Sequence, residues 1–148
     1  MSRLLAHGVP ARLLRLEITE SALLAEPTRA REVLSRLHAA GVRISIDDFG
    51  TGYSSMGHLK HLPVDELKVD RSYVAEMSTS AEDAALVRSV IDLGHELGMT
   101  VVAEGVEDAA TVLALTDLQC DVAQGFLFCR PGSAADIAAF LHAPTPTR

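Results

Sequence analysis

The stretch Ile44-Ser45-Ile46-Asp47-Asp48-Phe49-Gly50-Thr51-Gly52-Tyr53 decides the fold. Its isoleucines alternate with polar residues at a period of two, which predicts a strand with one buried face that ends at Asp47. The two adjacent carboxylates repel each other, and a divalent cation between their oxygens removes that repulsion. The pair therefore indicates a metal site at the strand end. The alternative is an acidic turn in which Asp48 caps a helix.

The composition is that of one intracellular domain. The chain has 148 residues, of which 48% are hydrophobic, enough for a core. Its net charge of −7 argues against binding to a nucleic-acid polymer and suits a carboxylate site that takes up cations. Cys120 and Cys129 form no CxxC pair, so a zinc site or disulfide framework is not expected. With no signal peptide or membrane span in the sequence, we expect a cytoplasmic protein.

Strands and helices alternate along the chain. The apolar patterns predict strands over 13–18, 43–47, 66–69, 99–103 and 122–127. Helical spacing and capping residues predict helices over 27–40, 54–61, 80–97, 108–116 and 133–141. No hairpin signal separates any two strands, so the alternation predicts a parallel α/β fold, with a domain over 1–142 and a loose tail over 143–148.

Acidic residues stand at or near the carboxyl ends of four predicted strands. In parallel barrels the loops at these ends carry the chemistry. The residues concerned are Glu17, Asp47, Asp48, Asp70, Glu104 and Glu107. Lys68 lies within a strand, where lysine is uncommon. This convergence predicts a metal-assisted site, and the alternative is a set of hydrated loop acids.

Five motifs, in this order, resemble the EAL-domain family of cyclic di-GMP phosphodiesterases. They are Glu17-Ile18-Thr19-Glu20, Asp47-Asp48-Phe49-Gly50-Thr51-Gly52, Lys68-Val69-Asp70, Ala103-Glu104-Gly105-Val106-Glu107 and Gln124-Gly125-Phe126. The resemblance covers nearly the whole chain. It implies a (β/α)8 TIM-type barrel that hydrolyses cyclic di-GMP to linear pGpG with Mg²⁺ or Mn²⁺.

The resemblance also implies roles for individual residues. Glu17 and Asp47 would be metal ligands, with Asp47 bridging two ions and Asp48 binding the second. Lys68 would hold the attacking water or the developing phosphate charge, and Glu104 would be a metal ligand or a general base. Two cations that flank a phosphodiester lower the pKa of the attacking water and stabilise the attacking and leaving oxygens.

The remaining candidates support this centre. By the same resemblance, Glu107 assists Glu104, and Gln124 reaches the site from the last strand. Glu20 would anchor the loop after the Asp47 strand. The substrate and loop-support set is Glu20, Asp70, Phe49, Gly50, Thr51, Gly52 and Tyr53. The two aromatic residues could contact a guanine, and packing within the loop is the alternative.

The resemblance begins inside the family's barrel. The chain has no Glu-Ala-Leu tripeptide and no asparagine, both of which the family's first half supplies. Five strands are predicted where a complete barrel has eight in about 250 residues. We therefore expect a partial barrel that lacks its N-terminal strands. Its open strand edges and an apolar inner face would favour a homo-oligomer or a second, barrel-completing chain.

Two functions are compatible with these patterns. The first is a cyclic di-GMP phosphodiesterase in truncated form. The second is a catalytically inactive EAL remnant that binds cyclic di-GMP or another protein. The retained acids favour the enzyme, and the missing ligands favour the regulatory module.

Overall fold

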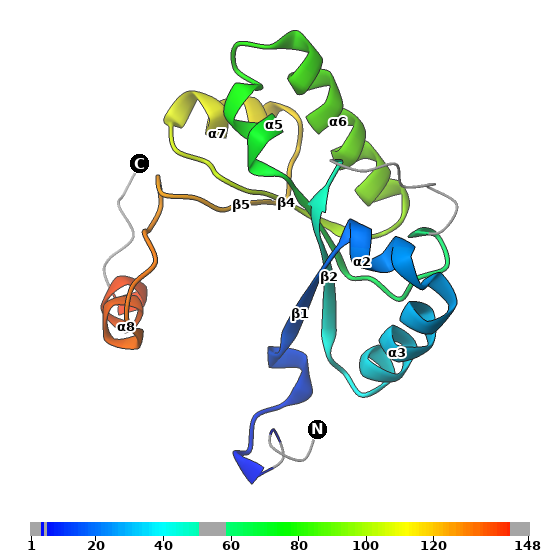
Figure 1. Cartoon of the computed structure of the whole chain (residues 1–148). Coiled ribbons are helices and arrows are strands. Elements are labelled where there is room, and N and C mark those ends of the chain that lie inside the picture. The colour runs from blue at the N-terminus through cyan, green and yellow to red at the C-terminus, as the bar shows by residue number, and fades with distance from the viewer. Residues whose placement is uncertain (1–3, 5, 51–58, 143–148) are drawn as a thin grey trace.

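The chain forms one parallel sheet in the order β1-β2-β3-β4-β5 (Figure 1). The computed structural model describes residues 4, 6–50 and 59–142. The strands are β1 (Arg15–Thr19), β2 (Arg43–Phe49), β3 (Glu66–Val69), β4 (Thr100–Ala103) and β5 (Val122–Ala123). Every neighbouring pair is parallel, so the predicted five-stranded α/β fold is confirmed. The barrel is not closed among the described residues.

Helices connect the strands. They are a 3-10 turn η1 (Ala11–Leu13), α2 (Glu20–Ala25), α3 (Pro27–Ala39), α5 (Arg71–Glu76), α6 (Ala81–Glu96), α7 (Ala109–Asp117) and α8 (Ala134–His142). Ser80 accepts a hydrogen bond from the backbone of Asp83, as its capping pattern predicts. Within the described part of the chain, no helix is both long enough and apolar enough to cross a membrane.

Some expected boundaries are wrong. Leu13 belongs to η1 instead of the first strand. The last strand stops at Ala123, because the chain turns after Gln124 and the Phe128 backbone nitrogen donates to Gly125 O at 3.1 Å. Two short helices, α2 and α5, were not predicted. Most of the helix expected over 54–61 lies outside the described residues.

The two faces of the sheet differ in chemistry. The helix side is apolar, and its fully buried residues include Ile44, Ile46 and Leu67. On the inner side, Ser45 Oγ donates to Glu66 Oε1 at 2.9 Å, and Arg15 Nη1 lies 2.5 Å from Glu66 Oε2. The expectation of an apolar inner face is therefore wrong, because the inward positions of β1, β2 and β3 carry charged and polar side chains.

At the base of the sheet, the side chain of an aspartate that precedes a strand links three elements. Asp65, before β3, accepts the Ile44 backbone N–H at 2.9 Å and the Arg43 guanidinium at 2.7 Å, and His38 of α3 lies 3.5 Å away. Asp121 repeats the arrangement before β5, where it accepts from Val101 N at 2.8 Å and lies 3.0 Å from His95 Nε2 of α6. The same arrangement thus occurs twice at the base of the sheet: an aspartate before a strand accepts a backbone N–H of the neighbouring strand and lies close to a histidine of a helix.

Replacing Asp65 with asparagine is expected to lower the free energy of unfolding at neutral pH by about 1.5 kcal/mol, since hydrogen bonds to a charged group are lost. Burial opposes ionisation of Asp65, but the Ile44 N–H, Arg43 and His38 outweigh it and lower its pKa. The aspartate therefore stabilises the fold above pH ~4, and this contribution disappears as the pH falls through the lowered pKa. Urea unfolding from pH 7 to pH 3 should show a flatter acid limb in the variant. The exposed Asp117→Asn is the control.

Gly94 allows α6 to lie directly on the sheet. A Cβ at this position would overlap Val101 Cγ2 and contact Leu67 Cδ1 at 3.6 Å. We expect Gly94→Ala to destabilise the fold by about 1–3 kcal/mol through overpacking, although alanine is the better helix former. Thermal unfolding of Gly94→Ala, Val101→Ala and the double variant checks this. The double variant should lose less than the sum of the single variants, and simple additivity would contradict the packing argument.

Candidate active site

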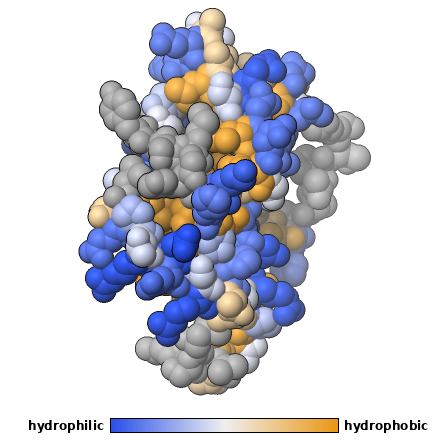
Figure 2. Space-filling model, turned by 90° about the vertical axis from the view of Figure 1, so that its right-hand side faces the viewer, coloured by the Kyte–Doolittle hydropathy of each residue, from blue (hydrophilic) through white to orange (hydrophobic). Residues whose placement is uncertain are grey.

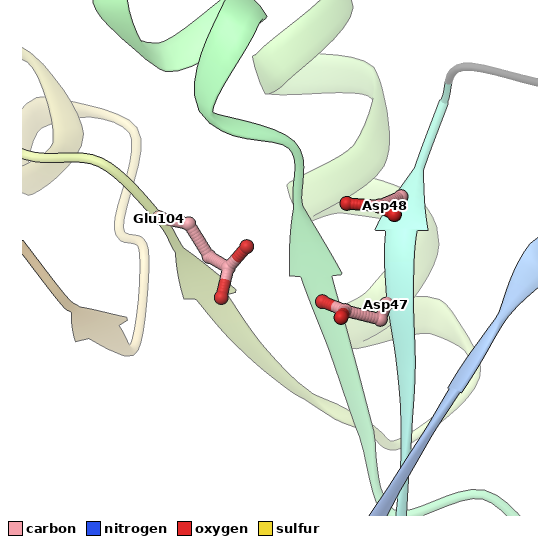
Figure 3. Close-up of side chains that lie close together, drawn as sticks. All are labelled: Asp47, Asp48 and Glu104. Atoms are coloured by element: carbon pink, nitrogen blue, oxygen red, sulfur yellow. The ribbon is translucent and has the colours of Figure 1, made fainter.

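β2 ends in an irregularity that brings two successive aspartates to one face. Neighbouring side chains of a regular strand point to opposite faces. Here the register with β3 shifts between Ile46 and Phe49, and Asp48 has a φ of 54°, in the left-handed region. As a result, carboxylate oxygens of Asp47, Asp48 and Glu104 lie within 4.8 Å of one another. Figure 3 shows both aspartates on β2 and Glu104 at the end of β4, with β3 between them.

Lys68 of β3 occupies the centre of this acidic group. Its Nζ lies 3.0 Å from Glu17 Oε2, 3.0 Å from Asp47 Oδ1 and 2.6 Å from Glu104 Oε1. Because the register aligns β1 to β4, these acids come from three different strands and meet around one ammonium. The Lys68 side chain is only 5% exposed. Such burial is possible for a lysine when its charge is fully paired.

The pKa values of the cluster follow from its charges. Burial disfavours the Lys68 ammonium, yet hydrogen bonds to Glu104, Asp47 and Glu17 outweigh this effect and raise its pKa. The pKa of Asp48 is raised by burial and by the negative charges of Asp47 and Asp70. Asp70 shares a hydrogen bond with Asp48, and its own pKa is lowered, although burial alone would raise it, because Ser72 donates to it. The cluster therefore has more negative charge than one lysine balances.

The donor set fits a hard divalent cation. Asp47, Asp48 and Glu104 supply carboxylate oxygens, and Glu17 adds another that lies 3.0 Å from Lys68 Nζ. Oxygen ligands of this kind suit Mg²⁺, Mn²⁺ or Ca²⁺ better than the softer metals that prefer histidine and cysteine. A cation would also relieve the repulsion that raises the pKa of Asp48.

Gly50, the residue that follows β2, is held by two side chains. Glu20, 3% exposed at the start of α2, accepts the Gly50 N–H at 3.3 Å through Oε2. Tyr73 of α5 donates its hydroxyl to Gly50 O at 2.9 Å. Phe49 is buried in the core, which agrees with packing instead of contact with a base. The other predicted loop residues, Thr51, Gly52 and Tyr53, lie outside the described part of the chain.

The remaining predicted site residues are more peripheral. Asp70 caps α5 by accepting the Ser72 N–H at 2.9 Å. Glu107 and Gln124 are exposed, and among the described residues no hydrogen bond or ion pair links their side chains to the Lys68 cluster. The backbone of Gln124 is fixed beside the cluster, because its N–H donates to Ala103 O at 2.8 Å and its carbonyl accepts the Val106 N–H at 3.0 Å.

Sequence patterns missed some of the residues that build this site. Tyr73 gave no signal, because its contact with Gly50 depends on how α5 packs. The Arg15, Ser45 and Glu66 network was also missed. A signal for it exists in the sequence, since Glu66 and Lys68 are two apart in one strand and must share a face.

The comparison with known proteins agrees with this geometry. MucR of Pseudomonas aeruginosa, a bifunctional diguanylate cyclase/cyclic di-GMP phosphodiesterase, is 46% identical over 136 residues, which are 92% of this chain and 20% of MucR. The cyclic di-GMP phosphodiesterase NbdA of the same species is 43% identical over 136 residues, which cover 92% of this chain and 17% of NbdA. The chain thus spans about a fifth of the length of these curated relatives.

Solved structures give the same result. A cyclic di-GMP complex of the PaMucR phosphodiesterase superposes with a TM-score of 0.89 at 45% identity, over 92% of this chain and 55% of that one. A manganese and cyclic di-GMP complex of Klebsiella pneumoniae BlrP1 gives a TM-score of 0.82 at 38% identity, over 88% of this chain and 33% of that one. The family model of the EAL domain matches residues 1–131. This chain therefore belongs to the EAL domain family.

Proposed function

We propose that the chain carries the carboxylate half of a cyclic di-GMP phosphodiesterase site, which hydrolyses cyclic di-GMP to linear pGpG. The observation that supports this most directly is the meeting of Asp47, Asp48 and Glu104 within 4.8 Å at the carboxyl ends of parallel strands. Relatives named as cyclic di-GMP phosphodiesterases, 43–46% identical to the chain, support the substrate.

The residues suited to hold Mg²⁺ or Mn²⁺ are Glu17, Asp47, Asp48 and Glu104. A bound cation supplies a more acidic water and stabilises negative charge on the phosphoryl oxygens. Lys68 positions this set, because its ammonium holds Glu17, Asp47 and Glu104 at 3.0 Å or less. In this proposal Glu104, a carboxylate of the same cluster, accepts the proton of the attacking water.

Electrostatics explain why the substrate and the cations would bind together. Cyclic di-GMP is an anion, and the chain has a net charge of −7. A phosphodiester beside Asp47 and Asp48 is repelled until positive charge is added. Since Lys68 is already paired with three acids, the cations must supply that charge. We therefore expect nucleotide affinity to depend strongly on Mn²⁺ or Mg²⁺.

A second candidate is a regulatory module that binds cyclic di-GMP, or another protein, without turnover. The observation in its favour is coverage, since the chain spans only 55% of the matched PaMucR phosphodiesterase chain. Under this proposal the carboxylates still bind cations, but the substrate lacks part of its surroundings. Association with a second copy or with a complementary chain could restore them.

Hydrolysis by the purified chain separates the two candidates. The chain is incubated with cyclic di-GMP and Mn²⁺, and pGpG is followed by chromatography, with Asp47→Asn as the blank. Product above the blank supports the enzyme. Without product, Mn²⁺-dependent binding of cyclic di-GMP supports the module, and the absence of both product and binding contradicts both candidates.

A further inference from the structure

Tyr73 of α5 contacts the residue after β2 with both its ring and its hydroxyl. The hydroxyl donates to Gly50 O at 2.9 Å. The ring lies so close that a Cβ at Gly50 would be 3.4 Å from Tyr73 Cε2 and 3.5 Å from Leu86 Cδ2. Tyr73 and Leu86 both pack against the hydrophobic core. Figure 2 shows apolar side chains that reach the surface in the middle of the side on which α2, α3 and α6 lie. Because apolar packing holds the ring, the hydroxyl has a fixed direction.

The backbone at this contact has an unusual conformation. Asp48 and Gly50 have φ values of 54° and 103°, both in the left-handed region. Between them, the buried Phe49 is paired with β3 in the ladder. A left-handed residue other than glycine persists only where the surrounding structure holds it. The competing conformation is a regular strand, in which the Asp48 side chain would point to the face opposite that of Asp47.

Two side chains hold Gly50 against this competing conformation. Because β2 has ended, Glu20 Oε2 accepts the Gly50 N–H at 3.3 Å and the Tyr73 hydroxyl donates to the Gly50 carbonyl. Glu20 belongs to one of the five sequence motifs, whereas Tyr73 lies outside them. The Tyr73 backbone N–H donates to Asp70 O at 3.2 Å, and Asp70 directly follows β3. Tyr73 therefore fixes the end of β2 relative to the strand that carries Lys68.

We infer that Tyr73 is a positioning residue for the cation site. Through Gly50, its hydroxyl holds Asp48 in the left-handed conformation. In that conformation, carboxylate oxygens of Asp48, Asp47 and Glu104 lie within 4.8 Å of one another. Loss of the hydroxyl keeps all three acids but lets Asp48 turn away, so a bound cation loses a ligand for part of the time. The inference rests on the proposed function, because it concerns the same cation site.

Tyr73→Phe tests this role, since it removes the hydroxyl and keeps the ring. Partners that support metal ligands typically change metal affinity by about 10- to 100-fold. We expect the apparent affinity of Tyr73→Phe for Mn²⁺, measured by isothermal titration, to be about 10-fold below that of the parent. Ser89→Ala is the matched control, because it removes another hydroxyl that donates to a backbone carbonyl, Ala85 O at 2.8 Å, at an exposed position of α6. It should titrate like the parent, and circular dichroism verifies that each variant is folded.

A double variant separates positioning of Asp48 from a general loosening of the fold. In the Asp48→Asn background, Tyr73→Phe should change the Mn²⁺ affinity little, because the carboxylate that it positions is gone. Asparagine suits this background, since it adopts the left-handed region as readily as aspartate does. A merely structural effect would lower the affinity by the same factor in both backgrounds, and that result overturns the inference.

The titrations also separate failure of this inference from failure of the proposed function. If the parent binds Mn²⁺ and Tyr73→Phe binds it equally well, the inference alone is wrong. If the parent binds no Mn²⁺, the proposed function is wrong, and the inference falls with it. A loss confined to Tyr73→Phe in the background that retains Asp48 supports both.

Discussion

Asp47→Asn is expected to lower the apparent affinity for Mn²⁺ by at least about 100-fold, beyond the loss typical of residues that only support metal ligands. Carboxylate oxygens of Asp47, Asp48 and Glu104 lie within 4.8 Å of one another, and Asp47 Oδ1 lies 3.0 Å from Lys68 Nζ. Asparagine keeps the shape of the side chain and removes its charge. Isothermal titration with Mn²⁺ measures the change.

The control for this titration is Asp92→Asn, which removes the same charge from an exposed position on α6. It should leave the Mn²⁺ titration unchanged, because the loss of one surface charge has little effect at physiological salt. An unchanged titration in Asp47→Asn itself would refute the assignment of the Asp47, Asp48 and Glu104 group as the cation site. The same pair of variants should separate active from inactive protein in the pGpG assay.

Lys68→Met is expected to destabilise the metal-free chain by about 3 kcal/mol, at the low end of the range for breaking a buried ion pair. The variant leaves Glu17, Asp47 and Glu104 without their shared counter-charge. The low end applies because the three acids are 48%, 25% and 19% exposed and water partly screens their repulsion. Urea unfolding in the presence of a chelator measures this loss. Lys60→Met, at an exposed position, should change stability little.

Mn²⁺ should stabilise the Lys68→Met variant more than it stabilises the parent. In the parent the ammonium competes with the cation for the same carboxylates, whereas in the variant the cation alone balances them. The rise in melting temperature on adding Mn²⁺ should therefore be larger in the variant. An equal or smaller rise would mean that Lys68 and the cation use different carboxylates.

Much of the fold follows from local patterns in the sequence. Apolar runs, Pro27 in the first turn of a helix and the cap Ser80 place the main strands and helices within a few residues of their observed bounds. The candidate acids follow from the predicted strand ends, because the carboxyl ends of parallel strands lie at one edge of the sheet. The convergence of Asp47 and Glu104 from two strands at one edge of the sheet was thus foreseeable from spacing alone.

The geometry of the site, in contrast, depends on contacts between segments that are distant in the sequence. The turn of Asp48 toward Asp47 arises from a register shift against β3, which no local pattern encodes. Lys68 meets its three acidic partners only because four strands, β1 to β4, pair in the observed register. Short helices such as α5 have too little periodicity to be predicted from local patterns. The polar inner face depends on residues of three strands together, Arg15, Ser45 and Glu66.

The inner side of this sheet is polar, although Ser45, Glu66 and Lys68 on it are buried. Glu66, Ser45 and Arg15 satisfy one another there, and the Lys68 cluster continues the polar surface toward the strand ends. If further strands joined this sheet, little apolar surface would be buried on its inner side. Most of the free energy that favours closing the barrel must therefore come from the strand edges and the outer helices.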